Sequence, residues 1–333
     1  MSNLMIHTPE GFRDYYGEEE ARRQRLMRSL HRVFETSGYS DIETPAVEFF
    51  DVFGSDVGTT PSNELYKFFD RDGHTLVLRP DFTPSVARAV AMHRTPSTLP
   101  VRLCYQGQTY VNSREYQLHL KEQTQMGVEL IGDGSAAADA EILRITCDLL
   151  KEAGLTEFQV SVGENDYFKA LAQDSGLTPE RIEDVRRLIS NKNFFGVSEL
   201  LESEKIQPAI QDAFVRMPQL FGGREVLEEA ARYAVNDGAK AAIARLIEIS
   251  RLVADTGNDR YISYDFGLLS KFHYYTGMIF SAFTYGVGEP VAKGGRYDRL
   301  LGHFGMDAPA VGVGVSIDQL MNALARKRAE KEA

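Results

Sequence analysis

The segment "QTQMGVELIG", residues 123–132, carries the pattern that decides the fold. Gln125 and Glu129 lie at the strand period and face one way, while the apolar side chains between and after them face the other way. This alternation predicts a β-strand with one face packed on a hydrophobic core. The face with the Gln and Glu side chains is either exposed to solvent or lines a polar cavity, and the pattern fits both.

The segments around this strand predict an antiparallel sheet with helices against it. Before it, "HTLVLR" and "VRLCYQGQTYV" have strand patterns, separated by one short helix that begins near Thr83 and ends before Pro96. After it, "SAAADAEILRITCDLLKEAG" predicts a helix with Ser135 as its N-cap and Gly154 as its stop, and "TEFQVSVG" alternates like a half-buried strand.

The N-terminal part predicts a helix followed by a strand with a proline. "EEEARRQRLMRSLHRVFETSG" has apolar residues at helical spacing and ends at Gly38, which can adopt the left-handed cap conformation. "YSDIETPAVEFF" follows, and Pro45 cannot donate to a strand ladder. Pro45 therefore suits an edge strand or the end of a strand at an interface. Whether this segment belongs to the core or to an interface is open.

The rest of the chain predicts one core domain with a helical insertion. Residues 166–257 are helical by period, with no convincing strand between the helices. Strand patterns resume with "RYISYDFG" and "GMIFSAFTYG", and "AVGVGVSIDQL" predicts a strand that leads into a helix. We therefore expect an α+β fold in which residues 1–165 and 258–333 form the core domain and residues 166–257 form an all-helical insertion.

Composition excludes several classes of function. The apolar runs fall short of the ~20 residues of a membrane helix, and the N-terminus has no signal pattern, so we expect a cytoplasmic protein without a membrane partner. The formal charge of −11 argues against a broad nucleic-acid surface, though not against a local basic patch. Cys104 and Cys147 are expected to be buried free thiols, and the histidine spacing predicts no metal site. No cofactor is expected.

Three further segments bear on chemistry, and each allows more than one interpretation. In "LRPDFTPSVARA", Asp81 and Thr83 could hold an ammonium group, or Thr83 could be an ordinary N-cap. In "KGGRYD", the two glycines would let the backbone approach a ligand or a strand closely, but the segment taken alone favours a tight turn in which Arg296 and Asp298 form a surface ion pair. "GVGVS" lacks the third glycine of a dinucleotide fingerprint, so it does not predict such a site.

Taken in order, six segments resemble the catalytic core of histidyl-tRNA synthetases. The resemblance covers nearly the whole chain apart from the helical insertion. The three motifs common to class II synthetases are matched by "GYSDIETPAVE", by "YQGQTYV" through "QTQMGVELIG", and by "AVGVGVSIDQL", in that order. The family segments LRPEGT, RGLDYYTG and GGRYDGL are matched by "LRPDFTPSVARA", "SKFHYYTG" and "KGGRYDRL". It implies a class II synthetase-like antiparallel sheet. It also implies a homodimer with two-fold contacts through the first helix and the strand around Pro45.

The chain departs from that family where the synthetases place catalytic arginines. Val111, Ser270 and Gln319 fall on the three arginine positions. Each lost cation typically costs ~2.7–4 kcal/mol of transition-state stabilisation, so adenylate formation should be abolished. Lys271 could partly replace the cation at Ser270 if the alignment shifts by one residue. The sequence also ends where the family continues into an anticodon-binding domain, so no tRNA partner is expected.

A synthetase-like core with these departures resembles the family of ATP phosphoribosyltransferase regulatory subunits. The resemblance implies a noncatalytic subunit that activates the short-form enzyme in the first step of histidine biosynthesis and takes part in histidine feedback. It also implies a catalytic ATP phosphoribosyltransferase subunit as the partner, in a hetero-octamer. The alternatives are a free-standing synthetase-like dimer that binds another partner and a truncated histidyl-tRNA synthetase, against which the missing arginines argue.

The resemblance also implies a histidine-like pocket, whose candidate residues are Asp81, Thr83, Gln125, Glu129, Lys271, Tyr274 and Tyr275. In the synthetase family the first three positions hold the amino group of histidine, while the positions of Glu129 and Tyr275 contact the imidazole. An acidic side chain strengthens a hydrogen bond from an imidazole N–H, which agrees with that role for Glu129. For the carboxylate of histidine, the sequence offers Lys271 or backbone amides.

Overall fold

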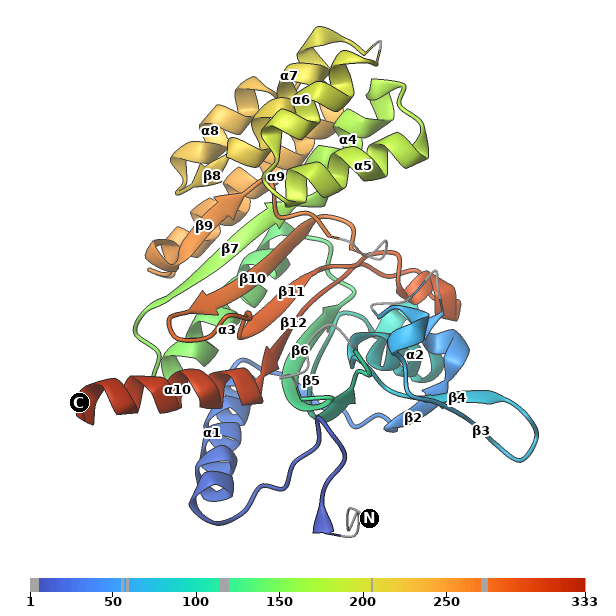
Figure 1. The fold of residues 1–333 in the computed structure, drawn as a ribbon, viewed down its shortest axis with the longest axis vertical. Helices are drawn as coiled ribbons and strands as arrows, with labels where there is room; N and C mark the ends of the chain where they lie inside the picture. The colour runs from blue at the N-terminus through green and yellow to red at the C-terminus, as the bar shows by residue number, and fades with distance from the viewer. Residues whose placement is uncertain are drawn as a thin grey trace.

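A nine-stranded sheet in the order β1-β5-β6-β12-β11-β10-β7-β9-β8 runs through the molecule (Figure 1). The computed structural model describes residues 6–54, 57, 60–113, 120–204, 206–270 and 275–332. The strands of this sheet are β1 (Ser40–Asp41), β5 (Val101–Tyr110), β6 (Glu122–Ile131), β7 (Phe158–Glu164), β8 (Phe221–Gly222), β9 (Ile262–Asp265), β10 (Met278–Thr284), β11 (Ala292–Arg296) and β12 (Ala310–Ser316). A smaller sheet has the order β2-β4-β3, from β2 (Val47–Phe49), β3 (Lys67–Phe69) and β4 (Thr75–Leu78).

The body of the large sheet is antiparallel, as the sequence predicts. From β5 through β6, β12, β11 and β10 to β7, every pair of neighbours is antiparallel. Two outer pairs differ, because β1 lies parallel to β5 and β9 lies parallel to β7. The expected α+β class is confirmed, and the parallel pairs make the sheet mixed.

Four helices belong to the predicted core: α1 (Gly17–Thr36), α2 (Thr83–His93), α3 (Ala136–Glu152) and α10 (Ile317–Glu332). Their predicted ends are confirmed. The Ser135 side chain accepts a hydrogen bond from the backbone N–H of Ala138, as an N-cap does. Gly38 and Gly154 follow α1 and α3 with φ angles of +83° and +90°, a conformation that glycine adopts without steric cost.

The segment between β7 and β9 is mostly helical. Its helices are α4 (Asn165–Ser175), α5 (Pro179–Ser190), α6 (Phe194–Glu202), α7 (Pro208–Arg216), α8 (Glu225–Arg232) and α9 (Asp237–Ala254). The segment is not all-helical, because the two-residue strand β8 adds to β9 at the edge of the large sheet. Two residues are too few to show a strand period, which explains why the sequence did not indicate β8. The division of the chain into domains stays a prediction.

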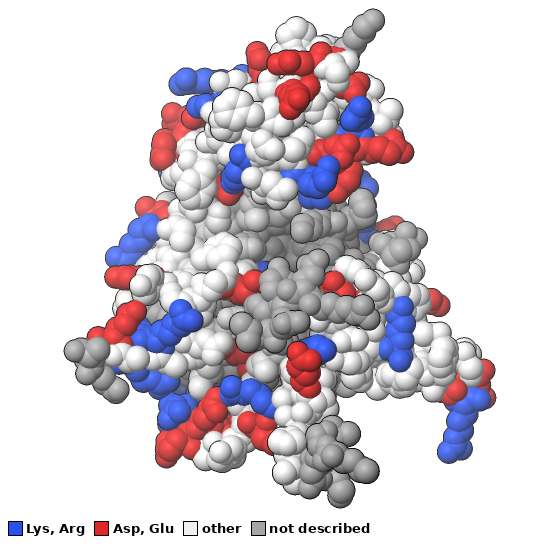
Figure 2. Space-filling view, viewed as in Figure 1, with Lys and Arg blue, Asp and Glu red and all other residues white. Residues whose placement is uncertain are grey.

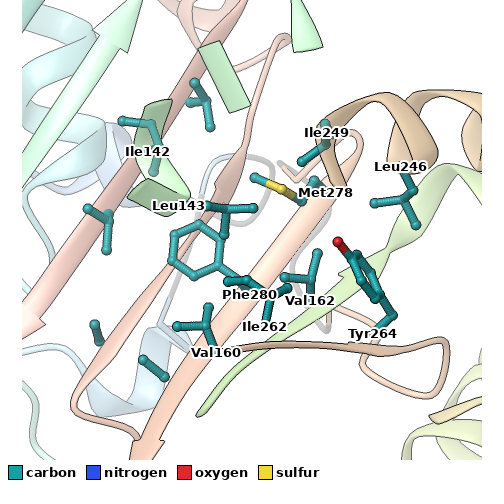
Figure 3. Close-up of a cluster of buried hydrophobic side chains, with 14 of the residues drawn as sticks. Ile142, Leu143, Val160, Val162, Leu246, Ile249, Ile262, Tyr264, Met278 and Phe280 are labelled. Atoms are coloured by element: carbon teal, nitrogen blue, oxygen red, sulfur yellow. The ribbon is translucent and has the colours of Figure 1, made fainter. Parts of the chain in front are cut away.

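One hydrophobic core joins the large sheet to both groups of helices. Val162 of β7 and Phe280 of β10 are buried beneath Leu143 of α3 (Figure 3). Leu246 and Ile249 of α9 belong to the same cluster, so the helical segment packs directly on the sheet. Each fully buried side chain of this kind contributes about 1.5–3 kcal/mol of hydrophobic stabilisation.

The surface and the two cysteines agree with the composition. On the face seen in Figure 2, basic and acidic side chains are interspersed, and no large basic area appears among the described residues of that face. Cys104 and Cys147 are buried and free, and burial raises the pKa of both thiols to about 12. In the part of the chain that is described, no helix is long and apolar enough to cross a membrane.

Candidate functional site

A cavity of about 340 Å³ lies on the face of the large sheet that is turned away from α3. Its floor comes from β6, β12 and β11, and α2 supplies one wall. Glu129 and Gln125 of β6 line the cavity, while Met126 and Val128 point into the core on the other face. The polar face of the opening sequence segment therefore lines a cavity and is not simply exposed to solvent.

Glycines in the floor of this cavity leave the space that its polar side chains occupy. A Cβ atom at Gly312 would collide with the Glu129 carboxyl group, and one at Gly314 would collide with the Gln125 side chain. Both glycines belong to "GVGVS" in β12, which pairs with β6. The glycines of that segment therefore serve the close approach of side chains from the neighbouring strand.

Glu129 is the most deeply placed acidic group of the cavity. It is 1% exposed and accepts hydrogen bonds from the hydroxyl of Thr83, at 2.7 Å, and from the hydroxyl of Tyr297. Burial raises the pKa of Glu129 to about 8; the bonds from Tyr297 and Thr83 oppose the shift, and the charge of Asp81 adds to it. A ligand with a positive or N–H-bearing group at this point would find a buried acceptor.

Asp81 is the second carboxyl group at the same end of the cavity. Its Oδ1 accepts a hydrogen bond from the backbone N–H of Thr83 at 3.4 Å, and the side chain of Gln125 bonds to it as well. Burial raises the pKa of Asp81, and these hydrogen bonds lower it. Two neighbouring carboxyl groups in a buried site favour a cationic ligand, since the like charges otherwise repel each other.

Tyr275 enters the cavity from the segment that precedes β10. Its ring packs so closely on Gly295 of β11 that a Cβ atom there would lie 2.9 Å from it. Its carbonyl accepts a hydrogen bond from Nζ of Lys169 on α4, at 2.9 Å. The next residue, Thr276, donates its backbone N–H to the Arg296 carbonyl at 2.8 Å, which fixes the segment beside the cavity.

Five of the seven predicted pocket residues therefore line one cavity: Asp81, Thr83, Gln125, Glu129 and Tyr275. Lys271 and Tyr274 lie outside the described residues. The N-cap residue of α2 is Phe82, and the Thr83 hydroxyl donates to Glu129, so Thr83 is not the ordinary N-cap that the sequence left open. Tyr297 of the segment "KGGRYD" also lines the cavity, and it was not among the predicted pocket residues.

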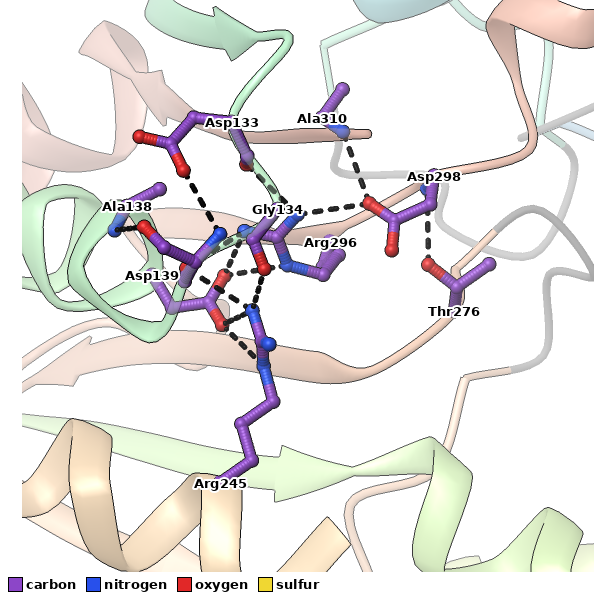
Figure 4. A network of polar contacts seen from close by, with 10 residues as sticks. Asp133, Gly134, Ala138, Asp139, Arg245, Thr276, Arg296, Asp298 and Ala310 are labelled. Carbon is purple, nitrogen blue, oxygen red and sulfur yellow. Dashed lines mark hydrogen bonds and ion pairs between the residues drawn. The ribbon is translucent and has the colours of Figure 1, made fainter. Parts of the chain in front are cut away.

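The interpretation of "KGGRYD" as a tight turn with a surface ion pair is wrong. Lys293 to Arg296 lie in β11, between β10 and β12. Arg296 does pair with Asp298, at 2.9 Å, but it is 2% exposed and also bonds to the fully buried Asp139 of α3 (Figure 4). Arg245 of α9 bonds to the same carboxylate, so one buried network joins α3, β11 and α9.

Two of the three positions that depart from the synthetase pattern line this cavity. Val111 and Gln319 line it, and neither side chain carries a charge. The backbone N–H of Ser270 donates to the side chain of Asn165 at 3.0 Å. At Val111 and Gln319 the cavity therefore has no fixed cation with which to stabilise a phosphate group.

Among the described residues, two groups have the residue types that bind metal ions, and hydrogen bonds explain both. His31 Nε2 lies 2.7 Å from Asp41, which also accepts a bond from the Cys104 thiol at 3.4 Å. Asp70 likewise bonds to His74, at 2.8 Å, in an exposed turn. Neither arrangement requires a metal.

The chain is similar to histidyl-tRNA synthetases and to ATP phosphoribosyltransferase regulatory subunits. The family model for histidyl-tRNA synthetase matches residues 11–320. The ATP phosphoribosyltransferase regulatory subunit of Acetivibrio thermocellus is 38% identical over 332 residues, which cover 100% of this chain and 79% of that protein. The regulatory subunit of Ruminiclostridium cellulolyticum is 36% identical, with coverage of 97% and 77%.

Solved structures show the same relationship. A Bacillus halodurans protein described as an ATP phosphoribosyltransferase regulatory subunit/histidyl-tRNA synthetase superposes with a TM-score of 0.90 at 35% identity, over 96% of this chain and 83% of that one. Histidyl-tRNA synthetase from Nostoc shares the fold, with a TM-score of 0.81 at 21% identity over 97% and 76%. The chain thus belongs to the family of ATP phosphoribosyltransferase regulatory subunits, which has the fold of class II histidyl-tRNA synthetases.

Proposed function

We propose that this chain is a noncatalytic subunit that binds and activates a short-form ATP phosphoribosyltransferase catalytic chain, in the cytoplasm and within a hetero-octamer. The observation that carries the proposal is the composition of the cavity. It keeps groups suited to an amine and an imidazole, while Val111 and Gln319 offer no charge to a phosphate. A ligand-binding pocket with neutral side chains at these two positions suits a sensor.

The ligand that fits this cavity is histidine. Asp81 and Gln125 would hold its ammonium group. Glu129 would accept a hydrogen bond from its imidazole, and Tyr275 would lie beside the imidazole. The cavity volume of about 340 Å³ is at the lower end of the range for small-molecule sites. Histidine bound here would report the end product of the pathway to the catalytic partner.

A signal from the cavity can reach the helical segment through contacts that the structure contains. Tyr275 bonds to Lys169 of α4, and the strand beside it carries Arg296, which pairs with Asp139. Asp139 pairs in turn with Arg245 of α9. Because this chain would supply no reacting group, activation requires that it bind preferentially to a more active conformation of the catalytic chain.

Assembly with the catalytic chain is the direct test of the proposed partnership. Mixed with a short-form ATP phosphoribosyltransferase from the same organism, this chain is expected to co-elute with it in a particle larger than either protein alone. Light scattering on the eluting peak gives the mass. Separate elution at micromolar concentrations of both chains would refute the partnership.

We also propose that the chain forms a homodimer through α1 and the strand that follows Pro45. One face of the small sheet supports this, because its exposed side chains are apolar: Val47, Phe49 and Phe68 are 40%, 55% and 39% exposed. Phe49 and Phe68 both pair with Leu76 of β4, so they share that face. A contiguous apolar face of this kind marks a protein interface.

The purified chain is therefore expected to have about twice the mass of its 37.3 kDa monomer in light scattering. Phe49→Glu should shift it toward the monomer, because a charge would be buried in the apolar interface. Phe69→Glu is the matched control: Phe69 is 72% exposed but pairs with Thr75, and so it lies on the opposite face. A wild-type monomer, or equal effects of the two variants, would count against the interface.

A further inference from the structure

Lys293 is the one cationic side chain among the described residues that line the cavity. Three carboxyl groups line it as well, those of Asp81, Glu129 and Glu289. Among the ion pairs between described residues, none includes Lys293, and the residue is exposed to solvent. The cavity thus has an acidic inner end and a single described ammonium group that no carboxylate holds.

The strand register places Lys293 on the floor of the cavity. Lys293 of β11 pairs with Gly314 of β12, which pairs with Gly127 of β6. Residues directly opposite each other point to the same face, and Gly127 shares its face with Glu129, two residues along β6. Both intervening positions are glycines, and the space above them is taken by the Gln125 amide at Gly314 and the Tyr105 hydroxyl at Gly127, so Gln125 lies between Lys293 and the acidic end of the cavity.

The separation along this floor suits a small molecule. Two strand spacings and two residues along a strand place the Cα atoms of Lys293 and Glu129 roughly 12 Å apart. Both side chains rise from the same face, so both can reach a ligand that lies between them. An amino acid with a polar side chain is shorter than this separation, and the flexible four-carbon stem of Lys293 can span the rest.

We propose that Lys293 binds the carboxylate of an imidazole-bearing α-amino acid whose imidazole is held by Glu129 and whose ammonium group is held by Asp81 and Gln125. The inference rests on the proposed function, which makes histidine the ligand. Val111 and Ser270 fill the arginine positions of the synthetase pattern, so a carboxylate there would meet no bidentate guanidinium group. Lys293 approaches from β11 and offers a point charge, which pairs with a carboxylate without a bidentate geometry.

The test compares two ligands that differ only in the carboxylate. L-histidine and histamine are titrated by calorimetry into the wild-type chain and into Lys293→Gln. The variant is expected to bind histidine roughly tenfold to a hundredfold more weakly, as loss of a hydrogen bond to a charged group implies, while its affinity for histamine stays within about twofold. Lys240→Gln, at an exposed position on α9, is the matched control and should change neither affinity.

Each other outcome overturns the proposal. Equal losses for both ligands would show that Lys293 shapes the cavity without contacting the carboxylate, and unchanged affinities would show that it does not contribute. If Lys271→Gln removes the difference between the ligands and Lys293→Gln does not, the carboxylate lies at residue 271. If neither ligand binds to the wild-type chain, the cavity is not a histidine site, whereas the proposed partnership fails only if the two chains do not assemble.

Discussion

Replacing Asp139 by asparagine is expected to lower the free energy of unfolding by about 3–5 kcal/mol, the usual cost of removing one partner from a buried ion pair. Asp139 is completely buried. Its carboxylate accepts from Arg296 at 2.7 Å and from Arg245 at 2.6 Å, so the substitution removes the charged partner of Arg245 and leaves the buried Arg296 with Asp298 alone. Burial raises the pKa of Asp139, while both arginines oppose that shift.

The effect should be large because the network joins three elements at once. Arg296 belongs to β11 and Arg245 to α9, and both also donate to backbone carbonyls at the start of α3, at Asp133 and at Gly134 and Ser135, respectively. Loss of the central carboxylate therefore weakens the contact between the helical segment and the sheet as well as the interior of the sheet. The response to histidine should weaken together with stability, since the same contacts connect the cavity to α9.

Asp148→Asn is the matched control for this measurement. Asp148 lies on the same helix and pairs with Arg144 one turn away at 2.8 Å, but both side chains are 34% exposed. Pairs of this kind contribute about 0.3–0.5 kcal/mol. Urea unfolding followed by circular dichroism should therefore separate the two variants clearly, and equal, small losses would show that the buried network contributes little.

Histidine-dependent exchange of pyrophosphate into ATP is expected to be absent. Adenylate formation concentrates negative charge on the reacting phosphorus, and Val111, Ser270 and Gln319 supply no cation for it. Each missing cation removes ~2.7–4 kcal/mol of transition-state stabilisation, so three missing cations remove about 8–12 kcal/mol. This lowers the rate roughly a millionfold or more. Without an adenylate the chain cannot charge a tRNA.

The exchange assay uses radioactive pyrophosphate, with an active histidyl-tRNA synthetase as the positive control. The expected signal for this chain equals that of a heat-inactivated sample. Histidine-dependent exchange above that level would show that other groups replace the arginines, and it would favour the truncated synthetase over the regulatory subunit. The assay needs neither tRNA nor the catalytic partner, so its outcome bears on this chain alone.

Local patterns were sufficient to predict most of the fold. The ends of α3 depend on Ser135 and Gly154, which lie next to the helix in the sequence and have a direct steric or hydrogen-bonding effect there. The two faces of β6 likewise follow from its alternation of polar and apolar residues. The parallel pairing of β1 with β5 could not be predicted in this way, since β1 has two residues and its partner lies about 60 positions further along.

The site was only partly predictable, because its most important contacts join distant residues. Arg296 suggested a surface pair with Asp298, whereas its main partner Asp139 lies 157 positions away. Tyr297 was overlooked since a tyrosine after an arginine carries no local signal, and its role appears only when β11 lies two strands from Glu129. Lys293 became a candidate for the same reason, through its register with Gly314.

A titration of enzyme turnover tests the central claim most directly. Increasing amounts of this chain are added to a fixed amount of short-form ATP phosphoribosyltransferase from the same organism, and phosphoribosyl transfer and particle mass are followed together. The account predicts that turnover rises and saturates at a fixed ratio of the two chains, in step with formation of the larger particle. An unchanged rate, with no co-elution of the two chains at any ratio, would contradict it.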